Sequence, residues 1–108
     1  MRIVRAYTSK DVLENGFRSD GLPFDLPPLP RLAIHEACVN AAKYGGNAFV
    51  LKIRRTWRAL ICAVTQENPV VFRIGGKAHG GCALIDKICR RRMMLNGGKT
   101  LALFFEKD

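Results

Sequence analysis

Apolar and polar residues alternate over several short stretches of the chain, and a period of two predicts β-strands. Phe49, Leu51 and Ile53 alternate in this way with Lys52 and Arg54. The stretch 59–65 is almost wholly apolar instead, which is typical of a central strand buried on both faces. The predicted strands cover residues 1–7, 48–55, 59–65, 69–74, 93–95 and 100–105.

Three other stretches repeat their apolar residues with helical spacing. A short helix is predicted over 10–15, with Ser9 as its N-cap and Gly16 after its end. A third helix is predicted directly after Gly81. The longest helix covers 29–44 and has an apolar stripe made of Ala33, Ile34, Ala37, Cys38, Ala41 and Tyr44.

The order of these elements predicts the fold class. Asn96, Gly97 and Gly98 are a strong hairpin signal before the last strand. Strands that follow each other closely, with helices gathered apart from them, indicate an α+β fold. We expect a two-layer α/β sandwich in which helices pack on one face of a mixed, mostly antiparallel sheet. A chain of 108 residues has room for one such domain, covering 1–108.

Composition excludes some classes of protein and favours others. Hydrophobic residues make up 48% and charged residues 25%, which argues against extensive disorder. No stretch approaches the roughly 20 apolar residues of a membrane span, so no membrane partner is expected. The first ten residues lack the apolar run of a secretory signal, and a cytoplasmic location is therefore expected.

The net charge is +9, from 18 Lys and Arg against nine Asp and Glu, and it favours anionic partners. Arg90, Arg91 and Arg92 form the single basic triplet. With Arg54, Arg55, Arg58 and Trp57 they are weak candidates for binding nucleic acid. Solvated side chains that only keep the protein soluble explain these residues at least as well.

The four cysteines occur singly, at Cys38, Cys62, Cys82 and Cys89. Because they form no Cys-x-x-Cys pair and lie in apolar runs, we expect buried thiols in a reducing compartment. A metal centre or a disulfide framework is not expected.

Glu36 and Asn40 are four residues apart on the longest predicted helix, so they point the same way at one margin of its apolar stripe. A glutamate there is able to deprotonate or orient a hydroxyl group or water. An asparagine oxygen suits Mg²⁺, which prefers oxygen ligands. A wet helix face explains the two residues equally simply, and from this pair alone we favour that explanation.

Gly80 and Gly81 precede the third helix, where free backbone N–H groups make an anion site. The alternative is a flexible connection. A phosphate-binding P-loop is excluded because Lys77 is followed by Ala78, and no dinucleotide-binding glycine spacing occurs.

Taken together, the segment from Arg31 to Gly45 resembles the asparagine box of the histidine-kinase-like ATPase superfamily, in particular its anti-sigma-factor serine kinases. The segment 79–88 resembles the second glycine box of that superfamily and the helix that follows it. The hairpin 93–105 lies where the family has one. The resemblance covers residues 29–105 and is weakest in the middle.

The resemblance implies a role for each matching residue. It implies that Asn40 coordinates Mg²⁺ between the phosphates of ATP and that Glu36 is the catalytic base. It implies that Tyr44 lines the nucleotide pocket, that Gly81, with Gly80, lets the backbone approach the phosphates, and that Thr100 lies near the adenine.

The chain departs from the family where an Asp-x-Gly-x-Gly motif is expected. Gln66 stands in place of the aspartate that contacts the adenine, and Asn68 in place of the first glycine. A glutamine amide is able both to accept and to donate a hydrogen bond. Gln66 is therefore included among the expected nucleotide-binding residues.

These residues support two hypotheses. The first is an Mg-ATP-binding regulatory domain that phosphorylates a serine or threonine of a protein antagonist. The alternative is a catalytically degenerate regulatory module that binds its partner without turning over nucleotide. In both cases the resemblance implies a regulatory protein partner, such as a sigma factor or its antagonist, and a possible homodimer.

Overall fold

The computed structural model describes residues 2–18, 22, 26–70, 73–74, 77–78 and 82–106, and all statements below concern these residues. They form three helices and seven strands in the order β1 (Arg2–Thr8), α1 (Ser9–Asn15), α2 (Pro28–Tyr44), β2 (Ala48–Arg55), β3 (Ala59–Gln66), β4 (Arg73–Ile74), β5 (Lys77–Ala78), α3 (Cys82–Ile88), β6 (Arg91–Leu95) and β7 (Thr100–Glu106).

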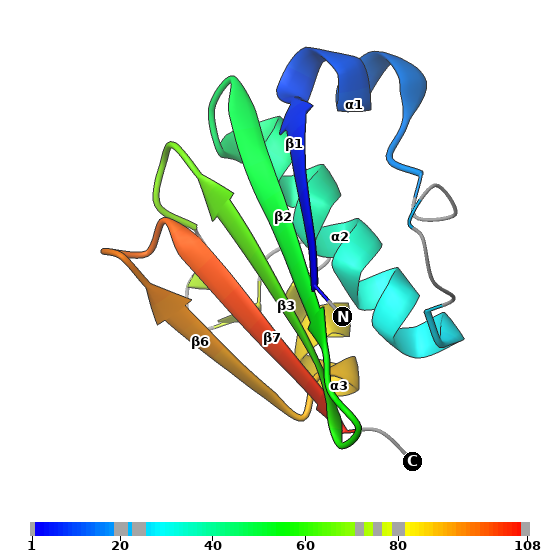
Figure 1. Cartoon of the computed structure of the whole chain (residues 1–108). Coiled ribbons are helices and arrows are strands. Elements are labelled where there is room, and N and C mark those ends of the chain that lie inside the picture. Colours follow the sequence, from blue (N-terminus) through cyan, green and yellow to red (C-terminus); the bar gives the residue numbers. More distant parts are fainter. Residues whose placement is uncertain are drawn as a thin grey trace.

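Five of the strands form one sheet in the order β1-β2-β3-β7-β6, and β4 pairs with β5 in a separate two-stranded ladder. Figure 1 shows the helices together on one side of the five-stranded sheet. The α+β fold class, with helices on one sheet face, is thus confirmed. Every described strand pair is antiparallel, which agrees with the expected mostly antiparallel sheet and shows no parallel pair among the described strands.

Side chains alternate between the two faces of the sheet, as the period of a strand requires. On β3 the even-numbered residues Leu60, Cys62 and Val64 are buried beneath the helices. The neighbouring odd-numbered residues are half-buried on the other side. We call that second side the open face, because no described helix covers it.

The helix α2 lies against the sheet through small residues. Ala33, Ala37 and Ala41 are almost completely buried, and short side chains let the helix backbone come close to the strands. The helix has Pro28 and Pro30 in its first turn, where a missing N–H costs nothing, and it ends at Gly45. With 17 residues it is the longest described helix, and none of the helices in the described segments is long and apolar enough to cross a membrane.

The start of α1 differs from the sequence prediction. Thr8, and not Ser9, caps this helix, because its Oγ1 accepts a hydrogen bond from the backbone N–H of Asp11 at 3.2 Å. The Ser9 hydroxyl instead donates to the carbonyl of Gly46 at 2.6 Å. Ser9 is buried, and it ties the end of β1 to the turn that follows α2.

That turn, from Gly45 to Asn47, also binds the end of β3. The carbonyl of Gly45 accepts hydrogen bonds from the backbone N–H groups of Glu67 and Asn68, at 2.9 and 3.0 Å. The Glu67 carboxylate in return accepts from the N–H groups of Asn47 and Ala48. The turn therefore connects α2, β2 and the residues after β3 in one hydrogen-bonded unit.

The predicted hairpin between β6 and β7 is present. Asn96 and Gly97 have φ values of 54° and 66°, which matches the preference of Asn-Gly for left-handed turn positions. The Asn96 side chain donates to the Thr100 hydroxyl at 2.9 Å. Of the strand expected over 69–74, the structure shows β4, while residues 71 and 72 lie outside the described part.

We predict that Gly45→Ala destabilises the protein by about 1–3 kcal/mol, the usual cost of overpacking. Its φ of −90° suits any residue, so the cost is steric: a Cβ there would lie 2.6 Å from the Ala41 carbonyl oxygen and 2.8 Å from Gln66 Cδ. Urea unfolding measures the change. Lys43→Ala, at an exposed position of the same helix end, is the control and is expected to change little. Equal stability of Gly45→Ala and wild type would contradict the packing described here.

Candidate functional site

Three of the predicted site residues follow one another along a single flank of α2. Glu36, Asn40 and Tyr44 are spaced by four residues, so each lies one helical turn from the next. Glu36 and Asn40 are half-buried, and Tyr44 is 55% exposed. The flank thus runs from half-buried positions at Glu36 and Asn40 to an exposed position at Tyr44.

A small cavity lies between this flank and the ends of β3 and β7. Its volume is about 20 Å³, which is the space of about one water molecule. Two elements supply its polar groups, namely α2 through Asn40 and Tyr44 and β3 through Gln66. The remaining lining residues are Ala37, Val64, Val70, Cys82 and Leu101.

Asn40 contacts the first residue of α3. Its side-chain amide donates a hydrogen bond to the sulfur of Cys82 at 3.6 Å. Burial raises the pKa of the Cys82 thiol, and the Asp86 and Glu36 carboxylates raise it further, while Arg92 and the Asn40 hydrogen bond lower it. Cys82 therefore stays protonated at neutral pH, next to the two polar residues of α2.

Gln66 is the last residue of β3 and is 8% exposed. Its backbone N–H donates to the Lys99 carbonyl at 2.8 Å, and its side-chain Nε2 donates to the Asn68 carbonyl at 2.9 Å. This second bond turns the amide nitrogen towards the loop after β3. Asn40, Tyr44 and Gln66 line the same cavity. Their assignment to nucleotide binding stays a prediction.

Thr100 lies elsewhere. Its hydroxyl is 2.9 Å from that of Thr65, its partner in the register of β3 and β7. Val64 and Leu101, the adjacent residues of the same pair of strands, line the cavity. Since neighbouring residues of a strand point to opposite faces, Thr100 is on the open face and does not line the cavity with Asn40 and Gln66.

Gly80 and Gly81, the predicted phosphate-binding glycines, lie outside the described residues. Cys82 and Val70 line the cavity and were not among the predicted site residues. Cys82 had a signal that sequence reasoning did not use, because it begins the helix directly after the two glycines.

The polar groups of the cavity suit an Mg-nucleotide, whereas its volume does not. Mg²⁺ binds through one or two protein oxygens together with phosphates and water, so a single asparagine oxygen fits the ion. The described residues hold no group of three or more His, Cys, Asp or Glu side chains that suits a metal without phosphate. The volume of about 20 Å³ is too small for a nucleotide in the described conformation.

The arginines singled out in the sequence do not form one cluster. Arg92 pairs with Asp86 of α3 at 2.7 Å and Arg90 pairs with Glu106 at 3.4 Å. Arg91 lies over the ring of Phe104, and Arg58 lies over the ring of Trp57. Their positions are divided between the helix side, the open face and the β2–β3 hairpin.

No protein-family model matches this chain, and no curated protein matches it. The resemblance to the histidine-kinase-like ATPases therefore remains a prediction from the motifs of this sequence.

The cysteines provide a test of how tightly the helices pack on the sheet. All four are free thiols, and Cys38, Cys62 and Cys82 are buried. Burial is the main reason that the pKa of Cys89 rises from 9.0 to about 11, so at pH 8 its thiolate fraction falls about 100-fold relative to the unfolded chain. We expect a thiol-specific disulfide reagent to label Cys89 about 100-fold more slowly in the native protein than in guanidinium.

The same shift makes stability depend on pH. The folded state keeps the proton of Cys89 to higher pH than the unfolded state, so the stabilisation is complete below pH 9 and is lost as pH rises towards 11. Urea midpoints of wild type and Cys89→Ser across that interval measure it. A native Cys89 that reacts as fast as the unfolded thiol at pH 8 would contradict this packing.

Proposed function

We propose that the protein is a regulatory domain that binds an Mg-nucleotide at the cavity between α2 and the ends of β3 and β7. The observation that carries the proposal is the meeting of Asn40, Tyr44 and Gln66, from two separate elements, at one cavity. Glu36 lies one turn from Asn40 on the same flank. The output of such a domain is its effect on a regulatory protein partner, such as a sigma factor or an antagonist.

Each residue of the site has a side chain that suits a different part of the Mg-nucleotide. The Asn40 side-chain oxygen supplies a ligand for Mg²⁺, and the exposed Tyr44 ring covers the nucleotide at the solvent side. The Gln66 amide offers one donor and one acceptor to the base. Glu36 orients the acceptor hydroxyl group or water. When bound, the Mg-nucleotide supplies the phosphoryl group, and transfer needs chiefly positioning and charge neutralisation.

The size of the cavity sets a condition on this proposal. The Val70 and Cys82 side chains fill the space beside Asn40 and Gln66, so the binding-competent form has to displace them. When only a small fraction of the protein molecules is in the binding-competent form, the apparent affinity for the ligand is reduced by that fraction. We therefore expect weak, submillimolar to millimolar affinity for the nucleotide.

A second candidate function is favoured by the same volume. A regulatory module that binds its protein partner without nucleotide needs no larger cavity, and the hydrogen bond from Gln66 to Asn68 is then a structural contact. In that case Asn40 serves to join α2 to α3 through Cys82.

Titration calorimetry with Mg-ATP separates the two candidates. For the nucleotide-binding domain we expect saturable heat with the wild type and at least tenfold weaker binding by Asn40→Ala, a loss of about 1.4 kcal/mol. Asn47→Ala, the same change at an exposed position of the α2–β2 turn, is the matched control and should bind as the wild type does. Thermal melts show whether each variant is folded.

Absence of heat with the folded wild type at several millimolar Mg-ATP would overturn the nucleotide proposal and leave the second candidate. Equal binding by wild type and Asn40→Ala would also overturn it, because the nucleotide would then lie elsewhere.

A further inference from the structure

The open face of the sheet carries a row of side chains that crosses all five strands. The registers place Arg2 opposite Arg54, Arg54 opposite Ile61, Ile61 opposite Phe104, and Phe104 opposite Arg91. An aliphatic and an aromatic side chain thus occupy the middle of the row, and arginines occupy both ends. The row spans about 19 Å, from four strand spacings of about 4.8 Å.

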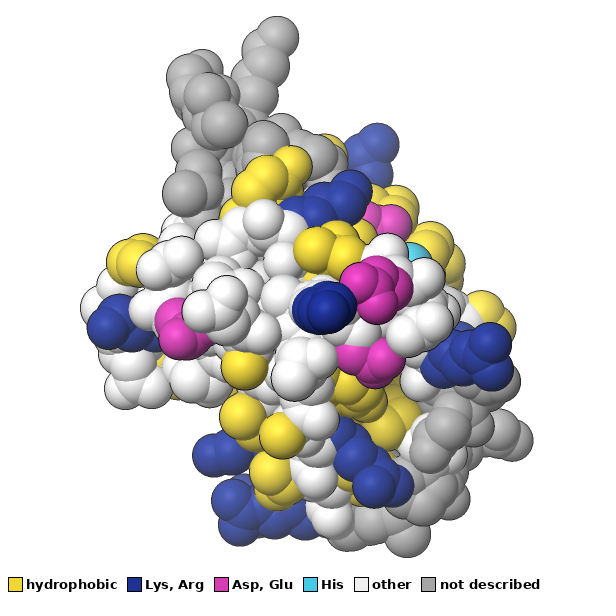
Figure 2. Space-filling view, turned by 90° about the horizontal axis from the view of Figure 1, so that it is seen from above, with side chains coloured by type: hydrophobic (Ala, Val, Ile, Leu, Met, Phe, Trp, Pro, Cys, Tyr) yellow, Lys and Arg dark blue, Asp and Glu magenta, His cyan; other side chains and the backbone are white. Residues whose placement is uncertain are grey.

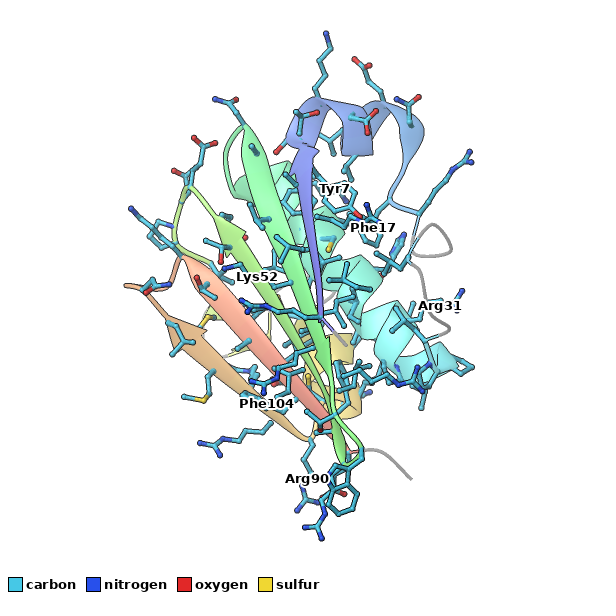
Figure 3. The ribbon with its side chains drawn as sticks, viewed as in Figure 1. Tyr7, Phe17, Arg31, Lys52, Arg90 and Phe104 are labelled. Carbon is cyan, nitrogen blue, oxygen red and sulfur yellow. The ribbon has the colours of Figure 1, made fainter. Side chains whose placement is uncertain are left out.

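A fourth cation lies beside this row. Lys52 is two residues before Arg54 on β2 and pairs with Ala63 of β3. Figure 3 shows Lys52 and Phe104 projecting from the sheet on the side away from α2. A groove of about 420 Å³, lined by Arg2, Lys52, Ile53, Arg54, Ile61 and Ala63, runs over this part of the face.

The cations of the open face have no acidic partners within the described part of the chain. Arg2 and Arg54 stand directly opposite each other, and like charges in that position destabilise a sheet. Glu106, the one acidic residue that the described strands place on this face, forms its ion pair with Arg90. The end of the molecule that carries α1 is different, because acidic and basic side chains lie beside each other there (Figure 2).

Two aromatic rings lie next to cations on or beside the open face. Phe104 is half-buried in the row, with the Arg91 guanidinium 5.9 Å from its centre. Trp57, in the hairpin that joins β2 to β3 beyond Arg54, is 77% exposed, with Arg58 4.2 Å from its centre. Unstacked bases stack on accessible aromatic rings of this kind while neighbouring cations contact the phosphates, and Phe104 is partly accessible and Trp57 largely so.

We propose that the open face binds single-stranded nucleic acid, with Arg2, Lys52, Arg54 and Arg91 contacting phosphates and Phe104 stacking against a base. A second copy of this face would bring four more cations against the first four, so charge disfavours a face-to-face homodimer. A face made of five strands is too wide to enter a duplex groove, since the major groove admits an α-helix or a two-stranded ribbon. The site is separate from the cavity beside Asn40, because it lies on the opposite side of the sheet.

Fluorescence anisotropy with labelled single-stranded DNA and RNA of about 15 nucleotides tests the proposal on the full chain. Four phosphate contacts predict a salt slope of about −2.8, so affinity should fall about 50-fold between roughly 50 and 200 mM salt. Arg2→Gln/Arg54→Gln should lower the slope by about 1.4 and weaken binding at least tenfold at the lower salt concentration. Phe104→Leu should weaken binding several-fold without changing the slope.

The matched control is Arg5→Gln/Arg18→Gln, which removes the same two charges at exposed positions outside the open face. This control should bind nearly as tightly as the wild type. Because Arg2→Gln/Arg54→Gln removes a like-charge pair, its urea midpoint should not fall, and lost binding is then not lost folding.

Three results would overturn the proposal. The first is no binding by the wild type at the lower salt concentration, and the second is an equal loss in both double variants. The third is equal competition by polyglutamate or duplex DNA of the same charge, which would assign the face to an acidic protein or to charge alone.

Discussion

The close contact between the turn after α2 and the end of β3 is the constraint on which the arrangement of this molecule depends. Gly45 has no side chain, and the space where a Cβ would lie is already taken by the Ala41 carbonyl and the Gln66 side chain. The Gly45 carbonyl accepts two backbone hydrogen bonds, and the Glu67 carboxylate closes the turn from the other side. The contact fixes where α2 ends relative to β3.

This constraint also brings the polar residues of the candidate site together. With Gly45 against Gln66, the preceding turns of α2 place Tyr44 and Asn40 beside the same end of the sheet. The Cys82 thiol and the Val70 side chain then cover the remaining space. The close packing of these elements brings the polar residues together. The same packing leaves a small cavity and so limits the size of the ligand that enters it.

Local patterns predicted the elements better than the contacts between them. The strand 48–55 was placed at its exact bounds, and the long helix within one residue of its start, because alternation and helical spacing are local signals. The cap of α1 was assigned to Ser9 instead of Thr8 because Ser9 bonds to Gly46, 37 residues away. No local pattern contains such a partner.

In the candidate site, too, the sequence predicted local features better than contacts between distant elements. Glu36, Asn40 and Tyr44 share a flank because helical spacing alone requires it. Gln66 was assigned to the site by the family resemblance, directly after a strand predicted to end at Thr65, and β3 extends one residue further to include it. The position of Thr100 depends on the register of β7 against β3, and a shift of one residue exchanges the two faces of a strand. The opposition of Arg2 to Arg54 likewise follows from register, so the sequence does not reveal it.

The two faces of the sheet have different chemistry as a consequence. The helix side holds a small cavity, and the open face holds cations and aromatic rings, with no acidic partner for those cations among the residues that the structure describes. Nitrogen-15 NMR during titration with Mg-ATP tests the shared cavity most directly, because the side-chain amides of Asn40 and Gln66 give their own signals. The account predicts that both amides and the Gly45 backbone shift together with a single dissociation constant, while the Asn15 amide on α1 stays unchanged. Shifts confined to the open face, or no shifts at several millimolar nucleotide, would contradict it.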